Sequence, residues 1–347
     1  MTTSRCVVGV VQAAGVPFDA DASVEIVRTY AEEASSQGCE LVLFPEAFLG
    51  GYPRGITFGA TIGRRTSEGR EWFRRYHAAA VEIDGPQVRE LERIAADTRT
   101  TLVVGIIERD GGTLYCAVVW IDPDDGLVGT RRKLLPTGTE RIVWGQGDLA
   151  RPTVVDTAVG PVGAAICWEN YMPLLRTFMY DQGVKIWCAP TADDRPGWEA
   201  TMRHIALEGR CFVLSANQFV RRSDYPDDYP LDVPPETVLS EGASMIVDPL
   251  GRVLAGPERG GEALLVAELD LDDIARSQLD FDAVGHYARA DLFQLEVSTR
   301  SQQLVRAGAG VARGRAPAAR EPSPNPAPDG SRPSIDWAKV HPCTTSL

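Results

Sequence analysis

The chain of 347 residues lacks several features that would place it in common functional classes. Basic residues are in deficit, with 35 Lys and Arg against 48 Asp and Glu and a formal net charge of -13. A field of this sign repels phosphate backbones and anionic membrane surfaces, so we expect neither nucleic acid nor a membrane as partner. No apolar run reaches transmembrane length and the first residues show no signal-peptide pattern, which together predict a soluble cytoplasmic protein.

Histidine is scarce, and no cysteine spacing indicates a metal site or a disulfide framework. The 4 histidines are scattered without an HExxH arrangement, and the 7 cysteines are odd in number and include no CxxC pair. Several cysteines lie within apolar runs, where a free thiol packs as a small hydrophobic group. We therefore predict no metal, no cofactor and chemistry carried by side chains alone.

Lysine is the rarest of the charged residues. It occurs at three positions, Lys133, Lys185 and Lys339. Arginine supplies every other strongly basic side chain. A lysine retained in such a background suits a role that needs a compact ammonium able to transfer a proton, because guanidinium stays charged in proteins. Chance retention is the alternative for any one of the three.

Apolar patterning alternates between strand and helix along the first 300 residues. Helical spacing predicts helices over 19–37, 68–80, 85–97, 173–182 and 198–210. Turn signals between 101 and 133, and again near 248–251, predict antiparallel hairpins between the parallel units. The pattern indicates a mixed-sheet α/β fold formed by one domain, residues 1–300.

Two segments depart from this alternation. The stretch 221–239 is rich in Asp, Pro and Tyr and long for a loop, so we predict either a binding or assembly role or a surface insertion. Residues 301–347 are dominated by Ala, Gly, Pro, Arg and Ser, with little apolar surface to offset the entropy of ordering. They are predicted to form a disordered, low-complexity tail.

Three predicted strands end in reactive side chains: LVLFPE in Glu46, LVGTRRK in Lys133 and VGAAIC in Cys167. Strand ends in α/β sheets border crevices where ligands bind, so a carboxylate, an amine and a thiol are predicted to meet there. Taken singly, each residue has a plainer interpretation. Glu46 could cap a loop, Lys133 could be a solvated strand end like the adjacent Arg131 and Arg132, and Cys167 could be a core thiol. The polar followers of Cys167 favour a thiol near solvent and a helix N-terminus, with thiolate stabilised.

These motifs resemble the nitrilase branch of the nitrilase, or carbon-nitrogen hydrolase, superfamily. The resemblance covers roughly residues 5 to 295, and its stretches are FPEAFLGGYPRG, RKLLPTGTER, CWENYMPLLR, APTADDRPGW, HIALEGRCFVLSANQ and DAVGHYARADLF. It implies a four-layer α-β-β-α sandwich that assembles into homo-oligomers, dimers or larger, including spirals.

The resemblance also implies roles for individual residues. It makes Cys167 the nucleophile, Glu46 the general base and Lys133 the group that stabilises charge and donates a proton. Glu140 would hold the lysine and the attacking water.

Around this predicted centre, Tyr52 and Trp168 are predicted to bind substrate, with an ordinary loop aromatic and a packing residue as the alternatives. Thr191 and Asp193 end another strand and are candidates for shaping the site, whereas His204 is expected to be a hydrogen-bonded helix residue.

The resulting prediction is a hydrolase of nitrile metabolism that converts a small organic nitrile to the carboxylic acid and ammonia. An amide-directed member of the superfamily, an amidase or carbamoylase with the same three residues, is the first alternative. A catalytically silent scaffold is the second. Aliphatic nitriles, arylacetonitriles, cyano-amino acids and cyanide all remain open as substrates, although Asn170 after the cysteine favours organic nitriles over cyanide.

Overall fold

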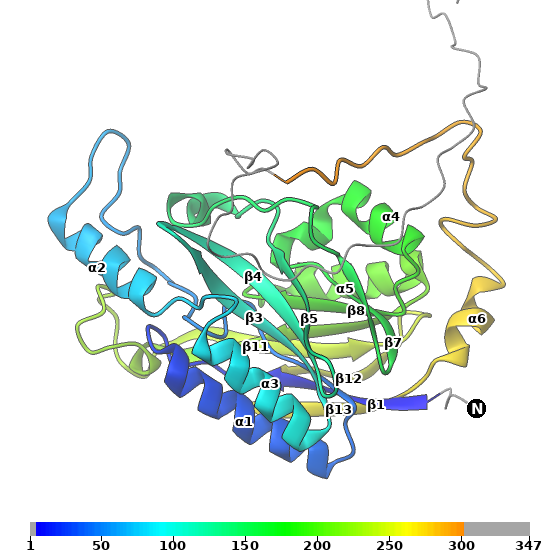
Figure 1. Ribbon diagram of the computed structural model, residues 1–347, viewed down its shortest axis with the longest axis horizontal. Helices are drawn as coiled ribbons and strands as arrows, with labels where there is room; N and C mark the ends of the chain where they lie inside the picture. Colours follow the sequence, from blue (N-terminus) through cyan, green and yellow to red (C-terminus); the bar gives the residue numbers. More distant parts are fainter. Residues whose placement is uncertain (1–4, 302–347) are drawn as a thin grey trace, which may run out of the picture. The chain divides into compact units, whose positions relative to one another are not determined.

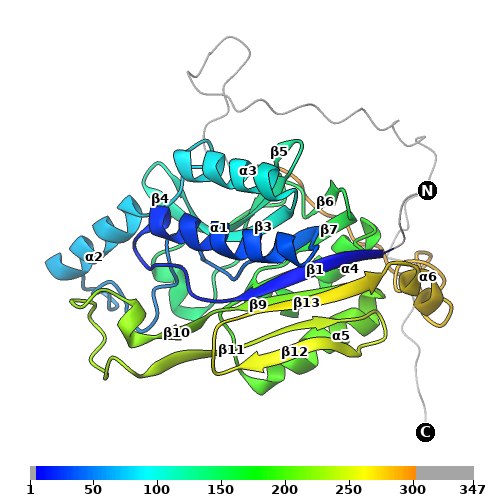
Figure 2. The same ribbon diagram turned by 90° about the horizontal axis from the view of Figure 1, so that it is seen from below.

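The computed structural model describes residues 5–301, which belong to one compact unit, and the predicted tail lies outside the described residues apart from residue 301. Two mixed sheets stack face to face, with helices on the outer side of each (Figure 1). Figure 2 shows α1 and α3 above the paired sheets and α5 beneath them. The α-β-β-α sandwich predicted from the sequence is therefore confirmed.

The first sheet runs in the order β13-β1-β2-β3-β4-β5. Its three central strands are parallel, whereas β13, β4 and β5 add antiparallel edges. The strands of this sheet are β1 (Arg5–Gln12), β2 (Leu41–Leu43), β3 (Thr101–Asp110), β4 (Thr113–Asp122), β5 (Gly126–Arg132) and β13 (Ala263–Asp270). The predicted hairpins between residues 101 and 133 are confirmed.

The second sheet follows the order β10-β11-β9-β8-β7-β6, with β12 paired to β11. Parallel strands again occupy the centre, here β7, β8 and β9. Its members are β6 (Val154–Thr157), β7 (Gly160–Ala164), β8 (Ile186–Thr191), β9 (Phe212–Asn217), β10 (Phe219–Arg221), β11 (Val238–Val247) and β12 (Val253–Arg259). Both sheets thus present the carboxyl ends of central parallel strands, where ligand sites tend to form.

The helices begin where local chemistry satisfies their first amides. Asp19 caps α1 by accepting from the backbone N–H of Ala22, and proline occupies the first turn of α3, α4 and α5, where no amide hydrogen is needed. The helices are α1 (Ala20–Ser36), α2 (Ser67–Ala78), α3 (Pro86–Thr98), α4 (Pro173–Asp181), α5 (Pro196–Gly209) and α6 (Asp272–Gln278). None of those in residues 5–301 has the length and apolar character needed to cross a membrane.

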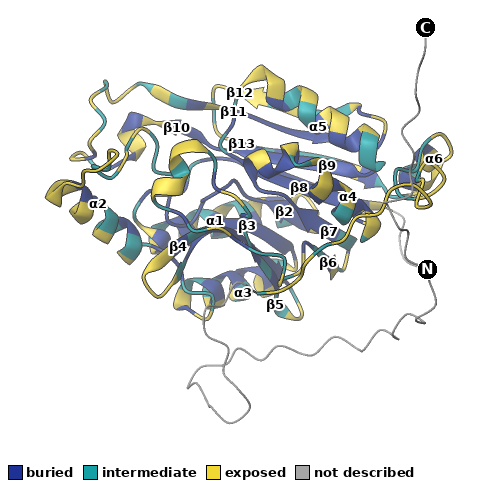
Figure 3. Cartoon of the chain, turned by 90° about the horizontal axis from the view of Figure 1, so that it is seen from above, coloured by how far each residue is buried: buried dark blue, intermediate teal, exposed yellow. Residues whose placement is uncertain are grey.

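Three buried layers hold the sandwich together. The central layer joins residues such as Leu43 and Val118 of the first sheet to Ile186 and Leu214 of the second. One outer layer packs α1 and α3 on the first sheet, and another packs α4 and α5 on the second. Figure 3 shows the central strands mostly buried, whereas exposed residues lie on helices, on loops and on strand β12. Burial of this apolar surface is the main term that favours the fold.

Candidate active site

Three predicted residues from different strands lie in one buried cluster. Glu46 follows β2 in the first sheet, Lys133 follows β5, and Cys167 follows β7 in the second sheet. Nζ of Lys133 donates to Oε1 of Glu46 at 2.7 Å, and both charges act on the Cys167 thiol. The structure therefore brings together the carboxylate, the amine and the thiol that the sequence placed at strand ends.

The carboxyl group of Glu46 is fully buried, and only one of its two oxygens accepts hydrogen bonds. Its Oε1 accepts from Lys133 and, at 3.5 Å, from the thiol of Cys116, whereas Oε2 has no hydrogen-bond partner among the described residues. Burial raises the pKa of Glu46, the ammonium of Lys133 lowers it and the charge of Glu140 raises it, with a net upward shift. A carboxylate of raised basicity with one free oxygen is suited to accept a proton.

Lys133 is held between two carboxylates. Besides Glu46, its ammonium donates to Oε2 of Glu140 at 2.8 Å, and Tyr52 donates its hydroxyl to Oε1 of Glu140 at 2.7 Å. Burial lowers the pKa of Lys133, but the charge of Glu46 and its neighbours outweighs burial and raises it well above the ordinary value. The lysine is therefore a fixed ammonium in the resting site.

Cys167 begins a short 3-10 helix, η2 (Cys167–Tyr171), with φ of 52°. Its sulfur accepts from the Thr191 hydroxyl at 3.3 Å and from the backbone of Ala192. Burial, followed by the charge of Glu46, raises the pKa of Cys167 to about 12. The predicted solvent-near thiolate is therefore wrong, since the side chain is only 4% exposed and a carboxylate faces it. A neutral thiol needs a base, which the adjacent carboxylate supplies.

This raised pKa gives a first prediction for Cys167. Because only thiolate reacts with iodoacetamide, the alkylation rate of Cys167 is expected to rise about tenfold per pH unit from pH 7 to 9, without a plateau. Mass spectrometry of the peptide containing Cys167 after timed alkylation measures the rate. An N-acetylated, unstructured CWENY peptide, whose thiol has a pKa of about 8.5, is expected to react only about threefold faster at pH 9 than at pH 8. A level profile for the protein below pH 8 would contradict the assignment of a neutral resting thiol.

A buried ion pair that the sequence analysis missed joins the lysine segment to the cysteine segment. Both guanidinium nitrogens of Arg131 donate to Glu169, at 2.6 and 2.9 Å, and neither side chain is exposed. Glu169 also accepts from the backbone N–H groups of Leu134 and Ile166. The prediction of Arg131 as a solvated strand end is wrong. Strand alternation was the available signal, because residues 131 and 133 share a face that residue 132 does not.

The flanking Arg132 is half-buried rather than freely solvated. Its guanidinium pairs with Glu108 and Asp110, both on β3, which β4 separates from β5. The prediction for this residue is therefore also wrong in part, because cross-strand carboxylates partly shield the side chain from water.

A glycine lets the first sheet approach the Glu46 turn closely. A Cβ placed on Gly105 of β3 would lie 2.2 Å from the carbonyl oxygen of Pro45 and 2.8 Å from Cα of Glu46. On the opposite side, Gln218 donates its amide to the carbonyl oxygen of Glu46 at 3.1 Å. The backbone that carries the carboxylate is thus fixed from both sides.

The remaining candidates surround this cluster at different depths. Thr191 contacts the sulfur of Cys167, whereas Asp193 accepts from the indole nitrogen of Trp168 at 2.9 Å. Trp168 is 40% exposed and, together with Trp198, borders a hollow of about 520 Å³. His204 lies outside the cluster, on the exposed side of α5 near Glu208.

The long loop predicted near 221–239 packs over the Tyr52 segment. Tyr225 and Tyr229 donate their hydroxyls to the carbonyl oxygens of Tyr52 and Arg54, both at 2.6 Å. Arg222 holds the loop itself, since its guanidinium donates to five backbone carbonyls, those of Tyr225, Pro226, Asp227, Tyr229 and Leu231. The loop therefore has a structural link to the site, and its proposed binding role rests on that link.

We expect Arg222→Leu to loosen this loop and impair the site. The change leaves buried carbonyl groups without their charged donor. If the resulting displacement of the loop reaches Tyr52, the loss of a charge-assisted hydrogen bond is expected to lower kcat/KM by roughly ten- to a hundredfold. The neighbouring Arg221→Leu is the control, because Arg221 is exposed and stacks on Phe219. Limited proteolysis should cut near 225–237 faster in Arg222→Leu. Equal cleavage and kinetics in the two variants would contradict the role.

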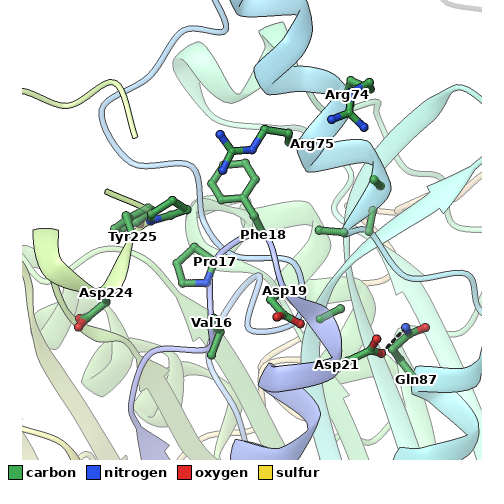
Figure 4. Close-up of a pocket in the computed structure, with 15 residues that line it drawn as sticks. Val16, Pro17, Phe18, Asp19, Asp21, Arg74, Arg75, Gln87, Asp224 and Tyr225 are labelled. Atoms are coloured by element: carbon green, nitrogen blue, oxygen red, sulfur yellow. Dashed lines mark hydrogen bonds between the residues drawn. The ribbon is translucent and has the colours of Figure 1, made fainter. Parts of the chain in front are cut away.

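Besides the hollow at Trp168, two larger hollows lie on the surface of the described residues, and one of these two borders the Glu46 cluster. A hollow of about 550 Å³ is bordered by Tyr52 and Glu140. A larger one of about 650 Å³ lies between the start of α1, the end of α2 and residues 224–226 (Figure 4). In it Asp21 pairs with the amide of Gln87, and no residue of the Glu46 cluster borders it. The hollow at Tyr52 is therefore the one suited to admit a substrate.

The described residues contain no group of three or more His, Cys, Asp or Glu placed to hold a metal ion. A thiol, a carboxylate and an ammonium gathered at the strand ends of such a sandwich are groups suited to thiol-dependent hydrolysis. Residues 7–278 match the family described as carbon-nitrogen hydrolase, and the chain belongs to that family.

Curated relatives define the branch. An aliphatic nitrilase of Sinorhizobium fredii is 52% identical over 298 residues, which cover 85% of this chain and 96% of the relative. A bifunctional nitrilase/nitrile hydratase of Nicotiana tabacum is 53% identical, with 83% of this chain and 84% of the relative covered. The predicted nitrilase branch is confirmed by these matches.

Solved structures share the fold at lower identity. The NitFhit protein of C. elegans has a TM-score of 0.66 at 21% identity. The match covers 88% of this chain and 70% of the NitFhit chain. An amidase from Nesterenkonia sp. has a TM-score of 0.61 at 20% identity, with 84% and 96% covered. At these identities the likeness establishes the α-β-β-α fold alone.

Proposed function

We propose that the chain is a nitrilase, an enzyme that hydrolyses a small organic nitrile to the carboxylic acid and ammonia. The observation that carries the proposal is the buried Glu46–Lys133–Glu140 chain beside Cys167, in which a basic carboxylate oxygen remains unpaired. Identity of about half over most of the chain with enzymes named nitrilases supports the choice of nitriles.

The first half of the proposed reaction forms a covalent bond. Glu46 takes the proton of the Cys167 thiol as sulfur bonds to the nitrile carbon, and the carbon–nitrogen triple bond becomes a double bond. Lys133 donates a proton to the nitrogen to give a thioimidate and recovers a proton from Glu46, which is then free to act as base again. The ammonium of Lys133 stabilises the negative charge that develops on nitrogen, and its fixed position between two carboxylates avoids reorganisation.

The second half releases ammonia and then acid. Glu46 activates a water that adds to the thioimidate carbon, ammonia leaves, and a thioester remains. A second water hydrolyses the thioester, returning the thiol and the carboxylic acid. If the tetrahedral adduct of water with the thioimidate instead expels the thiolate, an amide is released, so an amide by-product is a branch of the same mechanism.

The other predicted site residues receive supporting roles. Glu140 holds Lys133 in place, and it is itself held by the backbone N–H of Thr137 at 2.6 Å. Tyr52 is proposed to line the substrate hollow, since it borders it and bonds to Glu140. Trp168 is proposed to form a more distant wall through its half-exposed ring.

Paired substrates test the reaction class. Ammonia release is measured for phenylacetonitrile, 3-phenylpropionitrile, fumaronitrile and cyanide, and for the carboxamide of each organic nitrile, with acid and amide products separated. We expect acid and ammonia from at least one organic nitrile and much slower turnover of its amide. Comparable turnover of the amide would favour the amide-directed alternative, and folded protein silent on all of them would favour the scaffold.

We propose a homo-oligomer as the assembly. Apolar side chains stand exposed on the outer helices, with Leu174 of α4 at 66% and Leu207 of α5 at 43% exposure. Size-exclusion chromatography with light scattering measures the mass in solution, and a monomer at micromolar concentration would contradict the proposal. The cytoplasmic location stays a prediction from the sequence.

A further inference from the structure

Arg54 is a half-buried cation without an anionic partner. No carboxylate among residues 5–301 lies within 4 Å of its guanidinium, and its buried Nε has no hydrogen-bond partner there. The guanidinium donates once, from Nη2 to the carbonyl oxygen of Ala192 at 3.2 Å, and lies 5.1 Å from the centre of the Tyr52 ring. Most half-buried arginines among residues 5–301, by contrast, pair with carboxylates, as Arg75 does with Asp228 and Arg109 with Glu82.

This cation borders the proposed substrate hollow and is linked to the proposed nucleophile through one residue, Ala192. Arg54 borders the hollow together with Tyr52 and Glu140. The peptide group it contacts belongs to Ala192, whose backbone N–H in turn bonds to the sulfur of Cys167. Arg54 is thus linked both to the lining of the hollow and to the backbone segment that contacts the thiol.

The rest of the hollow is suited to a short aliphatic chain. Ile56, Phe58, Val143, Leu231 and Leu239 contribute apolar lining. Glu140 is the single acidic residue there, and its oxygens are already used by Lys133, Tyr52 and Thr137. A guanidinium with free donors above an apolar lining matches a carboxylate attached to a hydrocarbon spacer.

We infer that Arg54 selects nitriles that carry a carboxylate, so that the preferred substrate class is the ω-cyano carboxylic acids with a short aliphatic spacer. The guanidinium binds the carboxylate while the nitrile carbon reaches Cys167. This inference rests on the proposed nitrilase reaction and adds a specificity-determining residue to it. An electrostatic alternative exists, in which Arg54 only balances the net negative charge of Glu46, Lys133 and Glu140. That alternative affects charged and neutral substrates alike.

Matched substrates separate these two roles. The acids are 3-cyanopropanoate, 4-cyanobutanoate and 5-cyanopentanoate, and each is compared with its carboxamide, which has nearly the same shape without the charge. The measured quantity is the ratio of kcat/KM for acid over carboxamide. We expect this ratio to exceed one for the parent at one spacer length and to fall about ten- to a hundredfold in Arg54→Gln, mainly through KM of the acid.

Two further variants serve as controls. Arg54→Lys keeps the charge without the planar fork and is expected to recover part of the ratio. Arg74→Gln removes an exposed arginine that pairs with Glu71 and borders the other hollow, and is expected to keep the parental ratio. The thermal midpoint of each variant reports whether it is folded.

Each outcome has one meaning. A parent that hydrolyses the neutral carboxamides as well as the acids, or an Arg54→Gln variant that slows both equally, overturns the selectivity of Arg54 and leaves the nitrilase reaction standing. A folded parent that releases ammonia from none of the acids, carboxamides or phenyl nitriles overturns the proposed reaction itself. Loss of the acid preference in Arg54→Gln, with recovery in Arg54→Lys, supports the inference.

Discussion

Replacing Cys167 by alanine is expected to lower ammonia release from the best nitrile by at least about ten thousandfold, to the background rate. The reason is that every proposed covalent step passes through its sulfur, and removing a nucleophile leaves only the contributions of binding and electrostatics. The fold should survive, because the thiol makes a single side-chain hydrogen bond among the described residues, at 3.3 Å to Thr191, and alanine fits a buried strand end. Product formation by the purified variant is followed with acid and amide separated.

Cys188→Ala is the matched control for this experiment. Cys188 is a fully buried, free thiol in β8 of the same central layer, and burial likewise raises its pKa. Truncation of a buried side chain costs the control about 1 kcal/mol of stability without touching Glu46 or Lys133. Parental activity in Cys167→Ala, or equal loss in both variants, would contradict a nucleophilic role for Cys167.

The outline of the fold followed from local patterns. Helical spacing over 19–37 and the turn at Gly85-Pro86 predicted α1 and α3 to within about one residue, because a capping Asp and a leading Pro define a helix start. The short strands β6 and β10 were not predicted, since four- and three-residue strands carry too little alternation to stand out.

The candidate site could be predicted in its members but not in its electrostatics. Position at strand ends was enough to predict that Glu46, Lys133 and Cys167 meet, because the central strands β2 and β7 and the edge strand β5 end at the same place. Burial depends on contacts between distant segments, so the sequence did not reveal that the thiol is enclosed and neutral, or that Arg54 lacks a carboxylate. These tertiary facts decide the protonation states on which the mechanism depends.

The buried charged residues near the site form two separate ion-pair networks, which differ in whether a carboxylate oxygen is left unpaired. One connects Glu46, Lys133 and Glu140, where an oxygen is left free for chemistry. The other connects Arg131 to Glu169, where the carboxylate oxygens are saturated by guanidinium and backbone donors. Because both Glu169 oxygens are occupied, the second network is suited to positioning: it ties the backbone N–H of Leu134, after Lys133, to that of Ile166, before Cys167, although Nε of Arg131 has no partner among the described residues.

Arg131→Met is accordingly expected to lower the free energy of unfolding by about 3–5 kcal/mol. The change leaves the Glu169 carboxylate buried without its cation, which is costly because neither water nor another cation compensates it. For a chain of this size such a loss lowers the thermal midpoint by roughly 10 °C. Differential scanning calorimetry at neutral pH measures the shift.

Arg99→Met tests whether burial, rather than pairing as such, causes this loss. Arg99 makes an equally good two-pronged contact with Asp124, at 2.6 and 3.0 Å, but both side chains are about two-thirds exposed. Water replaces a lost partner at such a surface, so removal of an exposed pair costs at most about 1 kcal/mol. A midpoint drop in Arg131→Met no larger than that in Arg99→Met would mean that the buried pair does not hold the two catalytic segments together. A large drop confined to Arg131→Met, with kcat reduced in the fraction that stays folded, is the result expected if the ion pair positions Lys133 against Cys167.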